Sequence, residues 1–223
     1  MSHTIFIICI FRVFFVQEFN IPRLISERVS VLQHLREEYV KNLCVSIANL
    51  GDNEFSNCHA IHVSGTEAQS DSILWHEQRR WRITASKVKQ LITNPKSIAN
   101  LLWKEVYDLS HVPAIKWGRN NEGLARETYK NITNKEVTEV GLFISRSAPL
   151  FGASPDGLLD EGAGILEIKC PFGLRNSDLK DVKDTTVFTV HNGVISLRRT
   201  HSYFYQCQFA MFVTGARYCD FFI

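Results

Sequence analysis

The stretch that decides the fold reads SPDGLLDEGAGILEIK, residues 154–169. Successive side chains of a strand point to opposite faces, so Leu166 and Ile168 face one way while Glu167 and Lys169 face the other. One face joins the core, and the other presents an acid and an amine about 7 Å apart along the strand. The turn DEGAG folds Asp156 back toward them. The pattern therefore predicts a strand pair that carries a cluster of charged side chains.

This cluster has the chemistry of a metal site. Two carboxylates at close range repel each other unless something neutralises them, and a hard divalent cation with oxygen ligands is the usual solution. Asp156 and Glu167 are the two acids. Lys169 beside them can orient a metal-bound water as a nucleophile or lower its pKa. The stretch thus favours metal-dependent hydrolysis.

The strand register is the difficulty. With a five-residue turn, Leu159 pairs with Ile165. Asp156 then falls opposite Ile168, which is the wrong face for a shared site with Glu167. The site therefore requires a bulge or a one-residue offset, which the neighbouring glycines allow. The alternative is an exposed strand face with ordinary charges, because the spacing D-x10-E-x-K alone matches many proteins by chance.

Working outward, helices and strands alternate in the manner of a mixed α/β (α+β) domain. Hydrophobic spacing predicts helices over residues 85–92, 101–107, 120–132 and 202–213, the first of them capped by Thr84. Short apolar runs predict strands over residues 137–145, 149–154, 165–170 and 218–223. Asn192-Gly193, between residues 187–190 and 194–197, is typical of a hairpin turn.

The first 70 residues follow a different pattern. The apolar run Ile5–Val16 is interrupted by Arg12 and is shorter than the ~20 residues of a membrane-spanning helix. A buried strand or helix, or an unusual gene start, is favoured over a signal peptide, because no small-residue cleavage site follows. Residues 24–50 have the spacing of an amphipathic helix, and residues 51–70 have the composition of a linker. We therefore expect an N-terminal extension over 1–70 and a main domain over 71–223.

Composition narrows the class of protein. A chain of 223 residues suits one sizeable domain with an appendage. With 45% hydrophobic and 22% charged residues, it is neither disordered, collagen-like nor a multi-span membrane protein. The 25 basic and 23 acidic residues leave a net charge of +2, so any grip on nucleic acid needs a local basic strip. One candidate strip interleaves Arg79, Arg80, Arg82, Lys87 and Lys89 with tryptophans, although a solvated helix face is the alternative.

The six cysteines are sparse and irregularly placed, which indicates reduced intracellular thiols rather than a disulfide framework. Cys58, His59 and His62 form a weak candidate for a metal site. No second pair of ligands lies at zinc-site spacing, so a polar loop is the favoured interpretation.

Four blocks in order resemble the YqaJ-type viral recombinase and phage lambda exonuclease branch of the PD-(D/E)xK nucleases. They are Trp75-His76 with Arg79 and Ile83-Thr84-Ala85-Ser86; Trp117-Gly118-Arg119 with Glu122 and Ala125; Ser154-Pro155-Asp156-Gly157 with Leu166-Glu167-Ile168-Lys169-Cys170-Pro171; and Tyr205-Gln206-Cys207-Gln208 with Phe212-Val213-Thr214-Gly215. The blocks cover Trp75 to about Phe222. Ordered matches of this kind are much more specific than one motif.

The resemblance implies a restriction-endonuclease-like core, with a central mixed β-sheet flanked by helices, and a role for each matched residue. The implied metal ligands for Mg²⁺ or Mn²⁺ are Asp156, Glu167, the Ile168 carbonyl and Glu122. The implied catalytic residues are Asp156, Glu167, Lys169 and Gln206, the last of which orients the lysine or the water. Arg79 and Ser86 would bind the 5′ phosphate of DNA, together with Arg82 and Lys87 from the basic strip. Ser86 has separate support, because it follows Thr84 in a first helical turn, where free N–H groups favour an anion. Without the resemblance, Glu122 and Gln206 are ordinary polar helix positions.

The resemblance also has departures. Residues 173–200 are longer than the family loop and contain the additional hairpin, and phage members continue beyond the position of Ile223. Assembly into a homo-oligomer, such as the ring-shaped trimer of that branch, therefore stays open. We expect an intracellular protein, nuclear or mitochondrial, with duplex DNA ends as partner and no membrane. The leading hypothesis is a metal-dependent 5′-to-3′ exonuclease in recombination or repair. The alternatives are a catalytically weak DNA-binding module of the same fold, or an adaptor that uses residues 1–50.

Overall fold

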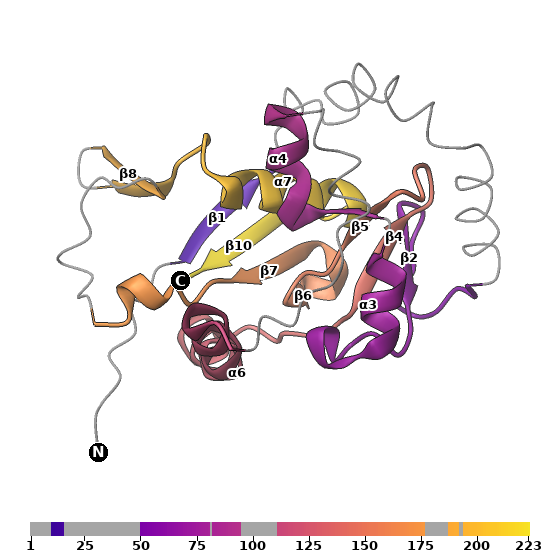
Figure 1. Ribbon diagram of the computed structural model, residues 1–223, viewed down its shortest axis with the longest axis horizontal. Coiled ribbons are helices and arrows are strands. Elements are labelled where there is room, and N and C mark those ends of the chain that lie inside the picture. Colours follow the sequence, from indigo (N-terminus) through magenta and orange to yellow (C-terminus); the bar gives the residue numbers. More distant parts are fainter. Residues whose placement is uncertain (1–9, 16–49, 81, 95–110, 177–186, 192–193) are drawn as a thin grey trace.

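The computed structural model describes residues 10–15, 50–80, 82–94, 111–176, 187–191 and 194–223. The predicted helix over 101–107, nearly all of the one over 24–50, and the Asn192-Gly193 turn lie outside these residues. Within the described ranges, no helix is long and apolar enough to cross a membrane. The strands form two four-stranded sheets and one hairpin, with helices on both sides, so the expected mixed α/β architecture is confirmed (Figure 1).

The first sheet carries the stretch that decides the fold. Its strand order is β1 (Ile10–Phe14), β10 (Tyr218–Phe222), β7 (Gly164–Ile168) and β6 (Gly157–Leu159). β7 and β10 run parallel, while β1 and β6 lie antiparallel at the two edges. All five residues of β7 are buried, as are all five of β10. The interpretation of β7 as an exposed strand face is therefore wrong, because helices cover both sides of the sheet.

The register of β6 against β7 resolves the difficulty in the sequence. Leu159 pairs with Gly164 and Leu158 with Ile165, one residue away from the simple alignment. The intervening turn is short because Asp160 and Glu161 adopt left-handed backbone angles, with φ of 48° and 56°. The required one-residue offset is therefore present, and it comes from the turn rather than from a bulge inside β6.

The second sheet has the order β2 (Ala60–Val63), β4 (Leu142–Ser145), β5 (Phe151–Ala153) and β3 (Ile83–Thr84). β2 lies within the stretch predicted as a linker, and all four of its residues are buried against β4. The prediction that residues 51–70 form a linker is therefore wrong over β2, because the polar residues on either side concealed a short buried strand of sequence AIHV. The domain boundary at residue 70 stays a prediction.

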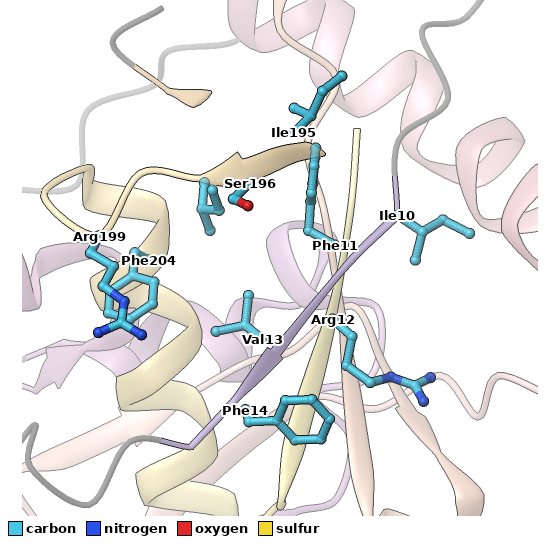
Figure 2. Close-up of a pocket in the computed structure, with 10 residues that line it drawn as sticks. Ile10, Phe11, Arg12, Val13, Phe14, Ile195, Ser196, Arg199 and Phe204 are labelled. Atoms are coloured by element: carbon cyan, nitrogen blue, oxygen red, sulfur yellow. The ribbon is translucent and has the colours of Figure 1, made fainter. Parts of the chain in front are cut away.

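The predicted hairpin is confirmed as β8 (Phe188–His191) and β9 (Val194–Leu197). It lies beside β1, where the rings of Phe188 and Phe11 are 5.2 Å apart. A cavity of about 450 Å³ separates β1 from β9 (Figure 2). Figure 2 also shows that Val13 and Arg12 point to opposite sides of β1. Of the N-terminal apolar run, the described residues 10–14 form a strand, β1, in which only Val13 is buried.

Two long helices sandwich the first sheet (Figure 1). α7 (Ser202–Thr214) packs with the larger core cluster, and left-handed Gly215 ends it with a φ of 79°. α6 (Pro113–Thr133) packs Ala125 and Tyr129 on the other side, against Leu166 and other residues of β6, β7 and β10. Pro113 in its first turn suits a helix start. Glu167 therefore points to the α7 side, opposite to Leu166 and Ile168.

The helix predicted from Thr84 is divided. Ile83 and Thr84 pair with β5, a 3₁₀ turn follows over Ala85–Lys87, and α4 (Val88–Thr93) has only six residues. The Thr84 side chain caps neither piece. The prediction of one capped helix is wrong because the β-branched pair joins a sheet, so the separate support for an anion at Ser86 is lost. The strand predicted over 137–145 is also shorter, since before β4 only Thr138 forms a bridge, to Leu158.

Candidate active site

The acids of the predicted cluster meet at the ends of β6 and β7. Asp156 lies just before β6, where its N–H donates to the Leu166 carbonyl at 2.9 Å. Its Oδ2 accepts from the Ile168 N–H at 2.6 Å. Gly157 follows because a Cβ at that position would overlap the side chain of Val137. The backbone thus fixes Asp156 beside the segment that carries Glu167.

Glu167 is held from two directions. Its Oε1 accepts hydrogen bonds from Lys169 Nζ and from Gln206 Nε2 on α7. Lys169 Nζ also donates to the Ile168 carbonyl at 3.1 Å. Four predicted site residues, Asp156, Glu167, Lys169 and Gln206, are therefore brought together by two adjacent strands and one helix.

Burial changes the pKa values of the charged side chains in this cluster. Glu167 is 2% exposed, and burial raises its pKa to about 7 although Lys169 acts against the rise. Burial also raises the pKa of Asp156, again against the effect of Lys169. Burial alone would lower the pKa of Lys169, but the charges of Glu167 and Asp156 raise it above its ordinary value. Lys169 is thus the cation that is hydrogen-bonded to Glu167, while Arg79 and Arg126 act on the two acids through their charges alone. The two acids repel each other.

Glu122 approaches from α6 at the margin of the cluster. Its side chain is 38% exposed and forms a 3.0 Å ion pair with Arg126, one helical turn away. Burial raises the pKa of Glu122, as does the charge of Asp156. Glu122 and Lys169 line a common cavity of about 360 Å³ with Phe172 and Tyr203. Glu122 is therefore close enough to interact electrostatically, but its partner in this structure is Arg126.

The donor set suits a hard cation. Two buried carboxylates and the Ile168 carbonyl provide the oxygen ligands that Mg²⁺ and Mn²⁺ prefer. In the described part of the chain, no three His, Cys, Asp or Glu side chains converge closely enough to form a complete metal site. The fit therefore rests on the two acids and the carbonyl. Cys58, His59 and His62 form no metal cluster either: Cys58 is exposed, and His62 is buried in β2.

A second group of residues surrounds Arg79 at the end of α3 (Ile73–Arg79). The Arg79 guanidinium lies 3.8 Å from the ring centroid of Trp75 and donates to Ser154 Oγ at 3.2 Å. Trp75 Nε1 donates to the same oxygen at 2.9 Å. Burial lowers the pKa of Arg79 to about 10, with the charge of Glu167 acting against the fall. Arg79 is thus a half-buried cation next to the carboxylate cluster. It contacts Ser154, which precedes Asp156 by two residues.

The other residues predicted to contact DNA differ in how exposed their side chains are. Ser86 is exposed, and its Oγ lies 3.4 Å from Thr84 Oγ1. Lys87 is half-buried. Arg82 is 2% exposed and donates to the carbonyls of Pro149 and Gln78. The guanidinium of Arg82 therefore contributes to the fold, and its contact with DNA stays a prediction.

Three residues of this site, Arg126, Ser154 and Tyr203, were assigned no role in it from the sequence. The i, i+4 spacing of Glu122 and Arg126 could have predicted their ion pair. Ser154 is part of the quoted motif, but nothing in the sequence indicates that it accepts from Trp75 and Arg79, which lie 79 and 75 residues away. Tyr203 precedes Gln206 by one helical turn and borders the cavity beside Lys169.

A mixed sheet between helices, with an acid before one strand and Glu-x-Lys at the end of its neighbour, defines the PD-(D/E)xK class of nucleases. Residues 74–217 match the family model described as YqaJ-like viral recombinase domain. Because this match spans more than half of the chain, the protein belongs to the YqaJ-like viral recombinase family.

Solved structures agree with this assignment. The chain is 29% identical to an alkaline exonuclease, LHK-Exo, from Laribacter hongkongensis, over 66% of this chain and 71% of that chain. The TM-score is 0.49 for that structure and 0.50 for LHK-Exo in complex with dAMP, at the same identity and coverage. No curated protein matches the chain. The structure with a TM-score of 0.50 supports the relation of this protein to an alkaline exonuclease.

Proposed function

We propose that this protein is a metal-dependent DNA nuclease that digests duplex DNA from 5′ ends, in recombination or repair. The observation that carries the proposal is the convergence of Asp156, Glu167, Lys169 and Gln206 at the ends of β6 and β7. Membership of the YqaJ-like family and the likeness to an alkaline exonuclease support it.

In this proposal, Asp156, Glu167 and the Ile168 carbonyl hold Mg²⁺ or Mn²⁺, with Glu122 close to the same site. When bound, such a cation stabilises negative charge on the phosphate and activates water. Lys169 contributes a positive charge and hydrogen-bond donors that orient the attacking water. Gln206 fixes Glu167 through its amide, so that the acid and Lys169 keep their mutual position.

Arg79 is the proposed partner of the 5′ phosphate. Trp75 and Ser154 hold its guanidinium in place, and the charge of Glu167 reaches it. Ser86 and Lys87 would add a hydroxyl and a second cation. The cavity of about 360 Å³ beside Lys169 and Glu122 offers room for the terminal nucleotide, in line with the LHK-Exo complex with dAMP. We also propose that residues 71–223 carry the catalytic residues and that residues 1–70 extend this domain, with β1 and β2 as edge strands of its two sheets; a homo-oligomer is compatible with this assignment.

The test uses 5′-phosphorylated linear duplex DNA with Mg²⁺, and closed circular duplex in parallel. The parent protein should release nucleotides from the linear DNA, and a label at the 5′ end should be released before one at the 3′ end. Lys169→Met should abolish release. Lys135→Met is the matched control, because Lys135 also forms an ion pair but contacts Asp160 and Asp220 instead.

The closed circle should stay intact, because digestion needs an end. Cutting of the circle would replace the exonuclease proposal with an endonuclease. Binding of DNA without any cation-dependent cleavage would instead support the catalytically weak DNA-binding module.

A further inference from the structure

The ammonium of Lys169 has three N–H donors, and among the described residues it contacts three groups. Two are oxygens, Glu167 Oε1 and the Ile168 carbonyl at 3.1 Å. The third is the ring of Tyr203, whose centroid lies 5.6 Å from Nζ. The two oxygens are also the groups proposed to hold the divalent cation. Of these three groups, only the Tyr203 ring is not also a proposed ligand of the cation.

The ring of Tyr203 is itself fixed. Tyr203 is the second residue of α7, and its N–H donates to Nδ1 of His201, the residue that caps this helix. The His201 ring lies 4.5 Å from the Tyr203 ring at an interplanar angle of 72°, and the Phe221 ring lies 5.4 Å from it. All these side-chain contacts involve the ring rather than the hydroxyl. The aromatic face that Lys169 meets is therefore held by a helix start and by β10.

We propose that Tyr203 is a positioning residue that keeps Lys169 at the reaction site when a divalent cation occupies the carboxylates; this rests on the proposed function. A cation on Glu167 and Ile168 draws electron density from their oxygens and repels the ammonium. The Tyr203 ring keeps attracting it, because the negative face of an aromatic ring binds ammonium groups within about 6 Å. Without the ring, Lys169 would leave the site at the moment when it is needed.

The first test measures the position of Lys169 without turnover. The protein is treated with a lysine-reactive reagent in Ca²⁺ and in EDTA, and labelling of Lys169 is followed by mass spectrometry. In Ca²⁺, Tyr203→Leu should be labelled several-fold faster than the parent, while Tyr203→Phe should match the parent. In EDTA all three should be labelled at similar rates, because Glu167 and Ile168 then hold the ammonium.

The second test separates kcat from KM on 5′-phosphorylated duplex with Mg²⁺. Tyr203→Leu should lower kcat roughly tenfold, the upper range of a desolvated cation–π contact, with KM for DNA changed less than twofold. Tyr203→Phe should restore kcat. Tyr205→Leu is the matched control, because Tyr205 is the next tyrosine on α7 and its ring faces Lys89, at 6.0 Å, rather than Lys169.

The outcomes are distinct. Equal labelling of the parent and Tyr203→Leu in Ca²⁺ would overturn the inference, and so would Tyr203→Phe being as impaired as Tyr203→Leu. If the parent cleaves DNA and the labelling rates are equal, the inference alone fails; if the parent binds Ca²⁺ but cleaves no DNA, the proposed function fails and labelling still decides the role of Tyr203. Should Tyr203→Leu lower the unfolding temperature, Tyr203→Met replaces it, because methionine keeps the bulk without the ring.

Discussion

Two equally buried acids on neighbouring strands differ in how their negative charges are compensated. Asp220 on β10 is 1% exposed, and Glu167 on β7 is 2% exposed. Asp220 accepts two 2.7 Å hydrogen bonds from Arg12 and one of 2.7 Å from the Tyr129 hydroxyl. Glu167 is hydrogen-bonded to the ammonium of Lys169, whose charge also acts on Asp156, and the pKa of Glu167 rises to about 7 because it is buried. The two acids also face different helices, α6 and α7.

The difference separates a structural acid from a functional one. At Asp220 a bidentate arginine joins the N-terminal strand β1 to the C-terminal strand β10, so the buried charge is compensated and holds the sheet together. At Glu167 the charge is left partly uncompensated, which costs stability but keeps a place for a cation. Burial alone therefore does not distinguish a structural acid from a functional one. The partners of each acid indicate its role.

We expect the largest effect, a loss of cleavage activity, when the functional acid Glu167 is replaced. Glu167→Gln should lower cleavage of linear duplex by at least about a thousandfold, because a ligand and a charge next to the reacting phosphate are removed. Its free energy of unfolding should be unchanged or higher, since a poorly compensated buried charge disappears. Cleavage rates and urea unfolding measure both. A variant that loses stability in proportion to activity would place Glu167 in the structural class.

We expect the next largest effect, a loss of stability, when the structural acid Asp220 is replaced. Asp220→Asn should lower the free energy of unfolding by about 2 kcal/mol, because Arg12 loses its charged partner but remains partly exposed and can turn to water. Cleavage per folded molecule should stay within about twofold of the parent. Urea unfolding and titration of active protein provide the two numbers. Loss of cleavage at unchanged stability would contradict the comparison.

A smaller change tests the tyrosine hydroxyl that is hydrogen-bonded to Asp220. Tyr129→Phe removes one buried hydroxyl and leaves both arginine bonds, so we expect a loss of about 1 kcal/mol in the free energy of unfolding. The same experiment on Thr128→Val, a neighbour whose hydroxyl bonds only within α6 and is exposed, provides the control. Equal losses for the two variants would show that Tyr129 contributes nothing particular to the Asp220 cluster.

The smallest effect concerns a buried base outside both clusters. Burial lowers the pKa of His62, against the charges of Glu67 and Glu54, and its Nε2 accepts from the Gly141 N–H at 3.0 Å. Since the unfolded chain then binds the proton more readily, this contribution to stability is complete above pH about 6.5 and is lost as pH falls below it. Unfolding free energies between pH 5 and 8 measure the slope, and His62→Gln should flatten it. An unchanged slope would remove His62 as its cause.

Much of the site could be predicted because its residues are close in sequence. The alternation in residues 164–169 predicted which side chains share a face, and the turn residues predicted that Asp156 returns toward Glu167. The residue spacing indicates that a one-residue offset is needed, but it does not indicate what produces the offset. It depends on left-handed angles at Asp160 and Glu161, which residues other than glycine seldom adopt.

The contacts that could not be predicted join distant parts of the chain. Arg12 and Asp220 are 208 residues apart, and Trp75 and Ser154 are 79 apart. No periodicity relates such pairs, because their proximity follows from strand order and not from local preference. The helix expected from Thr84 failed for a related reason, since pairing with β5 overrode a local capping pattern.

The most direct test of the central claim is cation binding measured by calorimetry, without DNA, on the parent, Glu167→Gln and Asp220→Asn. The claim is that Glu167 belongs to a metal-dependent nuclease centre and Asp220 to the framework. The parent and Asp220→Asn should bind Mg²⁺ or Mn²⁺ with similar affinity, and Glu167→Gln should lose at least about tenfold in affinity. Equal binding by the parent and Glu167→Gln, with the affinity lost in Asp220→Asn instead, would contradict the assignment.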